Sequence, residues 1–307
     1  MIMTVRGPVE DSNPGKTLTH EHVIIDFRGA EYTSNNDYEM SNVIDIVYPF
    51  LEEIKDLGYK CFVDCTPQFF GRDVLVLRKL SELLDIHILT STGCFAAGND
   101  KHIPSFFYGK DERGIAKIWV EEWNRGIGGT GIKPGIIKVA VDKGPLSEID
   151  NKVVSAACIT YHETGLTIMC HTGEKECAMQ VLEIIKKYKV PASKLIIAHA
   201  DSIEDKNTIF KLADEGCYVE YDWIGIKPIG YHVQLIKETI EKGFTAQILL
   251  SQDAGQYSVG EKDGGKEKFR PYTYVEKQLI PELIKELDIR IIDEIQRVNP
   301  LYALSIQ

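Results

Sequence analysis

The sequence lacks the features that mark membrane proteins and disulfide-stabilised secreted proteins. No run approaches the ~18 consecutive apolar residues of a transmembrane helix, and residues 1–6 show no apolar signal-peptide stretch. The seven cysteines are odd in number and scattered, without a C-x-x-C pair, which argues against a disulfide framework and for a reducing compartment. We therefore expect a cytoplasmic protein that has no membrane partner.

Positive charge is also in short supply. The 35 lysines and arginines are outnumbered by 46 aspartates and glutamates, which gives a formal net charge of −11. Such a field repels phosphate backbones, so we expect a small-molecule substrate and no nucleic-acid partner. Bound cations and local groups can override this field inside a pocket, so an anionic substrate is not excluded.

Linkers and low-complexity segments are missing too, and short apolar runs alternate with longer amphipathic stretches along the 307 residues. Eight such strand–helix alternations predict a parallel sheet with helical crossovers, and eight strands can close into a barrel. The expected strands are 17–25, 59–65, 86–92, 135–141, 166–171, 194–199, 217–221 and 246–251. The expected helices are 41–57, 72–84, 112–126, 148–164, 175–188, 204–215, 229–242, 273–286 and a terminal helix at 288–297.

We therefore predict an α/β fold in which residues 1–307 form a single (β/α)₈ TIM barrel domain with its active site at the C-terminal mouth. A long polar loop is expected at 259–268, at that mouth. The alternative is an open doubly wound sheet, which would require a glycine-rich phosphate turn after the first strand. No such turn follows His22.

Histidines and an aspartate stand where barrel enzymes keep their reactive groups. His20 and His22 share one face of the first expected strand, because side chains alternate along a strand. His171, His199 and Asp253 each follow or end an apolar run at its carboxyl end, and the carboxyl ends of barrel strands form the catalytic mouth. Imidazole and carboxylate groups bind zinc-like ions, although an isolated H-x-H pair is equally consistent with two ordinary histidines.

Lys138 lies inside the apolar run 135–141. A buried lysine is costly unless it is paired or chemically altered, and a protonated lysine has no lone pair to offer a metal. Spacing alone leaves two interpretations open. Lys138 either faces outward with its ammonium group in solvent, or is a metal ligand after deprotonation or conversion to a carbamate.

Taken together, segments 17–25, 71–74, 130–140, 171–173 and 299–300 resemble the phosphotriesterase-like family of the amidohydrolase superfamily, in order and over nearly the whole chain. The resemblance implies a (β/α)₈ barrel that binds two divalent metal ions. Its ligands are an H-x-H pair on strand one, a carboxylated lysine on strand four, histidines on strands five and six, and an aspartate on strand eight. The matching residues here are His20, His22, Lys138, His171, His199 and Asp253.

By this resemblance, Lys138 carries a CO₂-derived carbamate that bridges the two ions. The ions are expected to be zinc, with manganese, cobalt or iron as alternatives. The resemblance also implies that a metal-bridging hydroxide attacks an ester and that Asp253 is the catalytic residue that accepts its proton. Dimers are common in this family, so a homodimer is a further expectation.

Two departures from the family narrow the substrate. Phosphotriesterases proper carry a histidine after the strand-seven aspartate and a further aspartate beyond the strand-six histidine, and Trp223 and Ser202 occupy those positions here. Lactonases that act on acyl-homoserine lactones often have a tyrosine where this chain has Phe95. We therefore expect a lactonase that acts on a polar or phosphorylated sugar lactone.

Lys227, beyond the seventh expected strand, and Arg270, Tyr272 and Tyr274, beyond the eighth, are candidates for binding an anionic substrate, since guanidinium groups suit phosphate and carboxylate. The two cations could equally be solvated loop side chains. The alternative functions are a phosphotriesterase or other carboxyl or phosphate ester hydrolase, and a catalytically silent metal-binding barrel. The remaining histidines fit no ligand position and are expected in the core or at the surface: His87, His102, His162 and His232.

Overall fold

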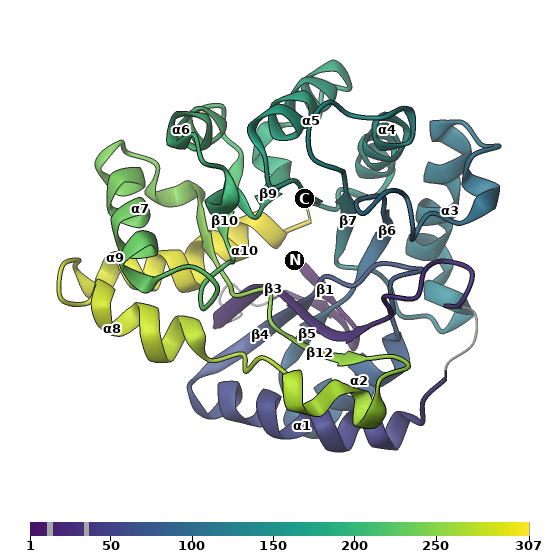
Figure 1. The fold of residues 1–307 in the computed structure, drawn as a ribbon, viewed down its shortest axis with the longest axis horizontal. Coiled ribbons are helices and arrows are strands. Elements are labelled where there is room, and N and C mark those ends of the chain that lie inside the picture. The colour runs from purple at the N-terminus through teal and green to yellow at the C-terminus, as the bar shows by residue number, and fades with distance from the viewer. Residues whose placement is uncertain (11–14, 34–36, 307) are drawn as a thin grey trace.

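The chain folds as a (β/α)₈ barrel, with helices arranged around a central barrel of strands (Figure 1). The computed structural model describes residues 1–10, 15–33 and 37–306. The barrel strands are β3 (Lys16–Ile25), β4 (Tyr59–Asp64), β5 (His87–Leu89) continued by β6 (Ser91–Phe95), β7 (Ile136–Ala140), β8 (Ile168–His171), β9 (Leu195–Ala198), β10 (Tyr218–Tyr221) and β11 (Ile248–Leu250). Parallel pairing runs through consecutive strands from β6 to β11 and from β3 through β4 to β5. The barrel closes between β11 and β3, where the backbone N–H of Asp253 donates to the carbonyl of His20 (3.1 Å).

Seven helices follow the first seven barrel strands: α1 (Met40–Asp56), α2 (Val74–Leu84), α3 (Glu112–Arg125), α4 (Glu148–Thr164), α5 (Lys175–Lys187), α6 (Lys206–Asp214) and α7 (Ile229–Glu241). Several begin at a residue whose side chain accepts hydrogen bonds from free backbone N–H groups of the first turn, such as Asp73 at α2 and Ser147 at α4. After β11 come β12 (Gly255–Ser258), which pairs with β3, and 3₁₀ turns over Lys262–Lys268. The chain ends in α8 (Ile280–Leu283), α9 (Ile289–Asp293) and α10 (Asn299–Leu304).

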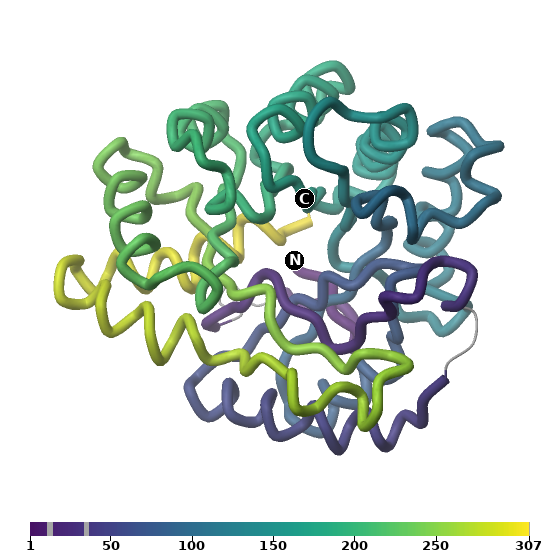
Figure 2. Tube along the Cα trace, in the orientation of Figure 1, coloured from purple at the N-terminus to yellow at the C-terminus, as the bar shows by residue number. Residues whose placement is uncertain are grey.

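The two termini close the end of the barrel opposite its mouth. They lie near each other at the centre of the ring (Figure 2), and the N–H of Ile306 donates to the carbonyl of Met1 (2.8 Å). Ile2, from the hairpin of β1 (Ile2–Thr4) and β2 (Gly7–Val9), packs with Leu304 against interior side chains such as Ile136. The carboxyl-terminal end of the barrel is therefore the end left for a functional site.

Every expected barrel strand is present, but several elements differ from the expectation. The expected strand 86–92 is split at Thr90 into β5 and β6, and neither the hairpin β1–β2 nor β12 was anticipated. The expected helix 273–286 begins with π turns over Val275–Leu279 before α8, and π turns over Glu294–Val298 likewise precede α10. Pro281 or Pro300 follows each π segment; proline has no N–H to donate, so a shift in the hydrogen-bond register accommodates it.

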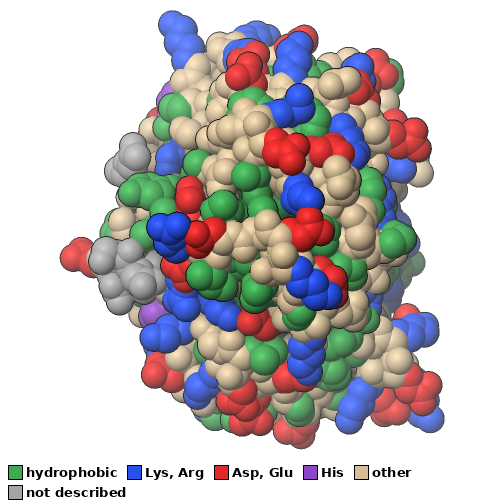
Figure 3. Space-filling view, turned by 90° about the vertical axis from the view of Figure 1, so that its left-hand side faces the viewer, with side chains coloured by type: hydrophobic (Ala, Val, Ile, Leu, Met, Phe, Trp, Pro, Cys, Tyr) green, Lys and Arg blue, Asp and Glu red, His purple; other side chains and the backbone are tan. Residues whose placement is uncertain are grey.

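The outer surface carries charges of both signs. On the face that bears α7, α8 and α9, acidic and basic side chains are interspersed with apolar ones (Figure 3). All seven cysteines are buried and unpaired. No helix among residues 1–10, 15–33 and 37–306 combines the length and the apolar character that crossing a membrane requires.

Candidate metal centre

The structure brings the six predicted ligands together at the carboxyl-terminal end of the barrel, where all of them line one cavity. His20 and His22 point inward from β3. Lys138 and His171 lie two residues beyond Ile136 and Met169, whose side chains fill the barrel interior. The period-two alternation of a strand therefore turns both of them inward as well.

His199 and Asp253 reach the cavity through an unusual backbone conformation. Each follows the last residues of its strand, β9 or β11, with a positive φ (59° for His199 and 46° for Asp253). Residues other than glycine rarely adopt this left-handed region, and such strain collects at functional sites. Here it turns the chain at the strand end, so that both side chains face the other four ligands.

The inward-facing atoms are those that a metal would need. The Nε2 atom of His199 lies 2.7 Å from Nδ1 of His171, and Nζ of Lys138 lies 2.8 Å from Nε2 of His20. Oδ1 of Asp253 lies 3.1 Å from Nε2 of His22 and 3.9 Å from Nε2 of His20. Ring nitrogens and a carboxylate oxygen therefore converge on one small volume. Imidazole and carboxylate groups are the mixed ligands that divalent transition metals prefer, so the residues fit a binuclear centre.

A second layer of side chains orients these ligands. Asp222, at the end of β10, binds Nδ1 of His20 through Oδ2 (2.9 Å) and Nδ1 of His199 through Oδ1 (2.8 Å). Nδ1 of His22 is bonded to the Thr66 hydroxyl (2.8 Å). Hydrogen bonds to one ring nitrogen fix the tautomer and aim the other nitrogen at the metal. No local sequence pattern predicts a role for Thr66, whereas Asp222 directly follows the apolar strand β10, the position where barrel enzymes keep reactive groups.

Burial and charge set the protonation of the imidazoles in different directions. Burial lowers the pKa of His22 to about 4 and holds the pKa of His171 well below its ordinary value, so both rings are neutral and have a free lone pair. Burial and Lys138 also oppose protonation of His20, but hydrogen bonds to Asp222 and Glu220 raise its pKa to about 10. Both of these hydrogen bonds are made at Nδ1, so Nε2 is left to face the other ligands.

The cavity that contains the ligands has about 340 Å³ of space and two unlike walls. Phe70 and Phe95 stack at a ring-centroid distance of 4.3 Å and form an apolar wall, with Phe95 5.2 Å from the His171 ring. Lys268 and Arg270 line the cavity as cations. The position of Phe95 offers no hydroxyl to a substrate, as the sequence indicated.

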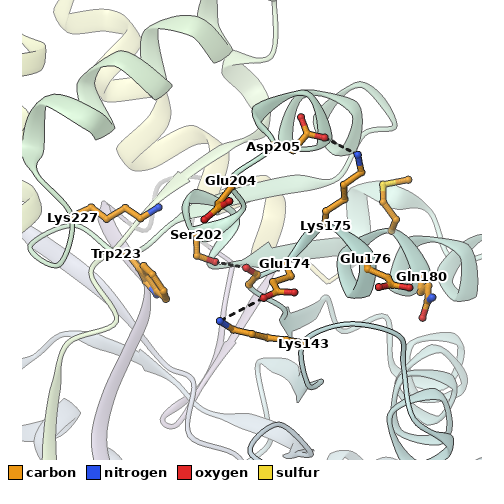
Figure 4. A pocket seen from close by; sticks show the side chains of 12 residues that line it. Lys143, Glu174, Lys175, Glu176, Gln180, Ser202, Glu204, Asp205, Trp223 and Lys227 are labelled. Atoms are coloured by element: carbon orange, nitrogen blue, oxygen red, sulfur yellow. Dashed lines mark hydrogen bonds and ion pairs between the residues drawn. The ribbon is translucent and has the colours of Figure 1, made fainter.

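A larger pocket of about 910 Å³ lies at the same mouth, over the loops that follow β8, β9 and β10 (Figure 4). Its wall includes Trp223, whose ring is 6.2 Å from that of His199. Of its three lysines, Lys143 and Lys175 pair with Glu174 and Asp205, respectively. Lys227 has no carboxylate partner in the described part of the chain. Its Nζ donates to the Asp201 carbonyl (2.6 Å) and lies 4.4 Å from the Tyr231 ring centroid.

The four side chains predicted to bind an anion lie in different places. Lys227 lines the larger pocket and Arg270 the ligand cavity, where the Arg270 guanidinium also donates to the Asp253 carbonyl (2.8 Å). Tyr274 is half-buried beside Arg270, 5.7 Å from ring centroid to guanidinium. Tyr272 is only 1 % exposed, and its hydroxyl donates to the His22 carbonyl (2.7 Å). The structure therefore does not support a substrate contact for Tyr272. Its hydroxyl instead stabilises β3 through the hydrogen bond to the His22 backbone.

Replacing Tyr272 with phenylalanine should cost about 1 kcal/mol of unfolding free energy, because a buried hydrogen bond to β3 is lost. Urea unfolding would measure the loss, and KM for the best substrate should not change. Tyr274→Phe is the matched control, since its hydroxyl has no hydrogen-bond partner among the residues that the structure describes. A raised KM in Tyr272→Phe with unchanged stability would restore the substrate role.

Comparisons with known proteins agree with this geometry. The model of the "Phosphotriesterase family" matches residues 1–303. An N-acetyltaurine hydrolase from Rattus norvegicus is 25% identical over 347 aligned positions, which cover 99% of this chain and 97% of the relative. The phosphotriesterase homology protein of Escherichia coli (strain K12) is 26% identical, over 88% of this chain and 90% of its own. A mutant of a Deinococcus radiodurans PTE-like lactonase has the same fold, with a TM-score of 0.90 at 22% identity, over 99% of this chain and 100% of that one.

Proposed function

The chain belongs to the phosphotriesterase family, and from that membership we propose that it is a metal-dependent hydrolase of a small anionic lactone, such as a phosphorylated sugar lactone. The observation that carries the proposal is the convergence of His20, His22, Lys138, His171, His199 and Asp253 on one cavity at the barrel mouth. Arg270 lines this cavity, and Lys227, which has no carboxylate partner among the described residues, lines the larger pocket beside lysines that pair with carboxylates. These two cations favour an anionic substrate over a neutral one.

The ligand set divides into two groups. His20, His22 and Asp253 lie close enough together to hold one ion, and His171 and His199 would hold the other, with Lys138 as a carbamate shared by both. When bound, two divalent ions supply an activated water and polarise the carbonyl oxygen under attack. The Asp253 side chain is 26% exposed to the cavity, so its carboxylate can reach that water and accept its proton.

The rest of the mouth suits a short polar substrate. The aromatic wall of Phe70 and Phe95 can pack against one face of a sugar ring. Lys227 and Arg270 then offer charge to a phosphate or carboxylate at its far end. Trp223 and Ser202 stand where phosphotriesterases proper have a histidine and an aspartate, and Ser202 donates to the carbonyls of Gly173 and His199. These departures favour a carboxyl ester over a phosphotriester.

A second candidate is hydrolysis of an N-acylated amino sulfonate. It is favoured by the N-acetyltaurine hydrolases among the relatives, one of which matches 99% of this chain. An amide of this kind presents a carbonyl carbon for attack and an anionic group that Lys227 could bind, so it makes the same demands on the site as a charged lactone.

A hydrolysis screen of zinc-reconstituted protein tests the proposal. A pH indicator follows the esters, each of which releases a proton, whereas N-acetyltaurine gives a carboxylate and an ammonium group with no net proton and is followed by detecting the released amine. The substrates are sugar lactones with and without a terminal phosphate, an acyl-homoserine lactone, a phosphotriester and N-acetyltaurine. We expect the phosphorylated lactone to have the highest kcat/KM. A preference for the phosphotriester or the neutral lactones would refute an anion-selective mouth, and a preference for N-acetyltaurine would establish the second candidate. Two bound metals without turnover of any substrate would indicate the catalytically silent barrel.

Replacing Lys227 with methionine should raise KM for the phosphorylated lactone by about 10- to 100-fold, because a hydrogen bond to a charged group contributes about 1.5–3 kcal/mol. The neutral lactone should be unaffected. The control is Lys186→Met. It removes the same charge from a lysine on α5 that pairs with Glu215. Equal effects of Lys227→Met on charged and neutral lactones would exclude Lys227 as the anion contact.

A further inference from the structure

A buried carboxylate lies beneath the metal ligand His20 and has no part in the proposed hydrolysis. Glu220 is fully buried on β10, two residues before Asp222, so both side chains face the barrel interior. Its Oε2 lies 3.0 Å from Nδ1 of His20, whereas its Oε1 has no hydrogen-bond partner among the described residues.

One ring nitrogen cannot satisfy two carboxylates. Nδ1 of His20 can carry one hydrogen, and Oδ2 of Asp222, at 2.9 Å, competes for it with Glu220. Asp222 has further donors in the Nδ1 and the backbone N–H of His199, whereas the side chain of Glu220 has only the shared donor in the described part of the chain. A buried carboxylate with so few donors is costly unless a cation lies nearby. The opposite side of the same ring, Nε2, is the side that faces the proposed metal site.

We propose that Glu220 is a positioning residue that helps to bind the metal ion held by His20. With Asp222 it turns Nε2 of His20 toward the ion, and its charge lies beneath that ion. A carboxylate bonded to Nδ1 also makes the ring a better donor at Nε2, and its negative charge attracts a divalent ion bound there. Among the described residues, the Asp222 side chain is hydrogen-bonded to both His20 and His199, whereas the Glu220 side chain is hydrogen-bonded only to His20. Glu220 therefore strengthens one of the two metal sites selectively.

The inference rests on the metal centre of the proposed function and is tested without substrate. Metal-free protein is titrated with Zn²⁺ against a chromophoric chelator, which yields two Kd values. In Glu220→Gln, which keeps the shape of the side chain, one Kd should rise by about 10- to 100-fold while the other changes little. Asp222→Asn should raise both values, and the exposed Glu241→Gln, which removes the same charge from the end of α7, should raise neither.

Unchanged Kd values in Glu220→Gln, or an equal rise in both, would overturn the inference. Glu220→Asp keeps the charge but withdraws it from Nδ1, so its affected Kd should lie between those of wild type and Glu220→Gln. If Glu220→Gln does not fold, this variant carries the test, and an unchanged Kd then refutes the inference. Failure of the wild type to bind two Zn²⁺ ions would instead refute the metal centre itself, and lack of turnover in the substrate screen would leave the inference standing.

Discussion

Replacing Lys138 with methionine should reduce hydrolysis of every substrate by on the order of 10³-fold or more, because the ligand proposed to be shared by the two metal sites would be lost. Methionine has a similar length and is apolar, which suits a position that is 1 % exposed and lies against Met169. The fold should therefore survive while metal content falls below two ions per chain. Turnover, metal analysis and circular dichroism measure the three consequences.

The control for this substitution is Ile136→Met, two residues earlier on the same strand and on the same interior face. It should retain both activity and metal. If Lys138 acts as a carbamate, metal-free wild type should also regain zinc faster in bicarbonate buffer than in buffer freed of CO₂, and Lys138→Met should show no such difference. Full activity with two ions in Lys138→Met would show that the lysine is not a ligand.

Replacing Asp253 with asparagine should lower kcat by about 10²- to 10⁴-fold, the usual contribution of a general base. Asparagine keeps the shape and can still offer an oxygen to a metal, but it cannot take up a proton from water. The measurement is kcat at saturating zinc, so that any loss of metal affinity is compensated. The exposed Asp214→Asn, at the end of α6, should behave as wild type. Recovery of wild-type kcat in Asp253→Asn with excess zinc would restrict Asp253 to binding metal.

Two local patterns allowed most metal ligands to be predicted from the sequence: the alternation of side chains along a strand, and the position of a residue at a strand's carboxyl end. His20 and His22, two residues apart, were expected on one face, and the apolar runs before His171 and His199 placed both at the mouth. Lys138 was ambiguous by spacing alone. The structure shows its inward orientation directly, because Nζ of Lys138 lies 2.8 Å from Nε2 of His20 in the ligand cavity.

The residues whose roles could not be predicted are those whose partners lie far away in the sequence. Glu220 and His20 are 200 residues apart, and no local pattern links a glutamate in an apolar strand to a histidine on another. Tyr272 was expected, with Arg270, to bind an anionic substrate. It is buried because Gly255 leaves room for it, since a Cβ there would lie 2.2 Å from the tyrosine hydroxyl. His232 lies in the core, one of its two expected places, and the sequence did not indicate its partner there, Asp201 (2.9 Å).

The contact between β11 and β3 that closes the barrel brings together proposed metal ligands from distant parts of the chain. His20 leaves the ribosome well before Asp253, and their backbones meet only when the barrel closes. A chain still under synthesis thus has the histidine pair of β3 but lacks the aspartate that completes its ligand set. The proposed site can therefore bind its metal with all three ligands only after the barrel has closed. A bound ion would indicate that β3 and β11 are paired.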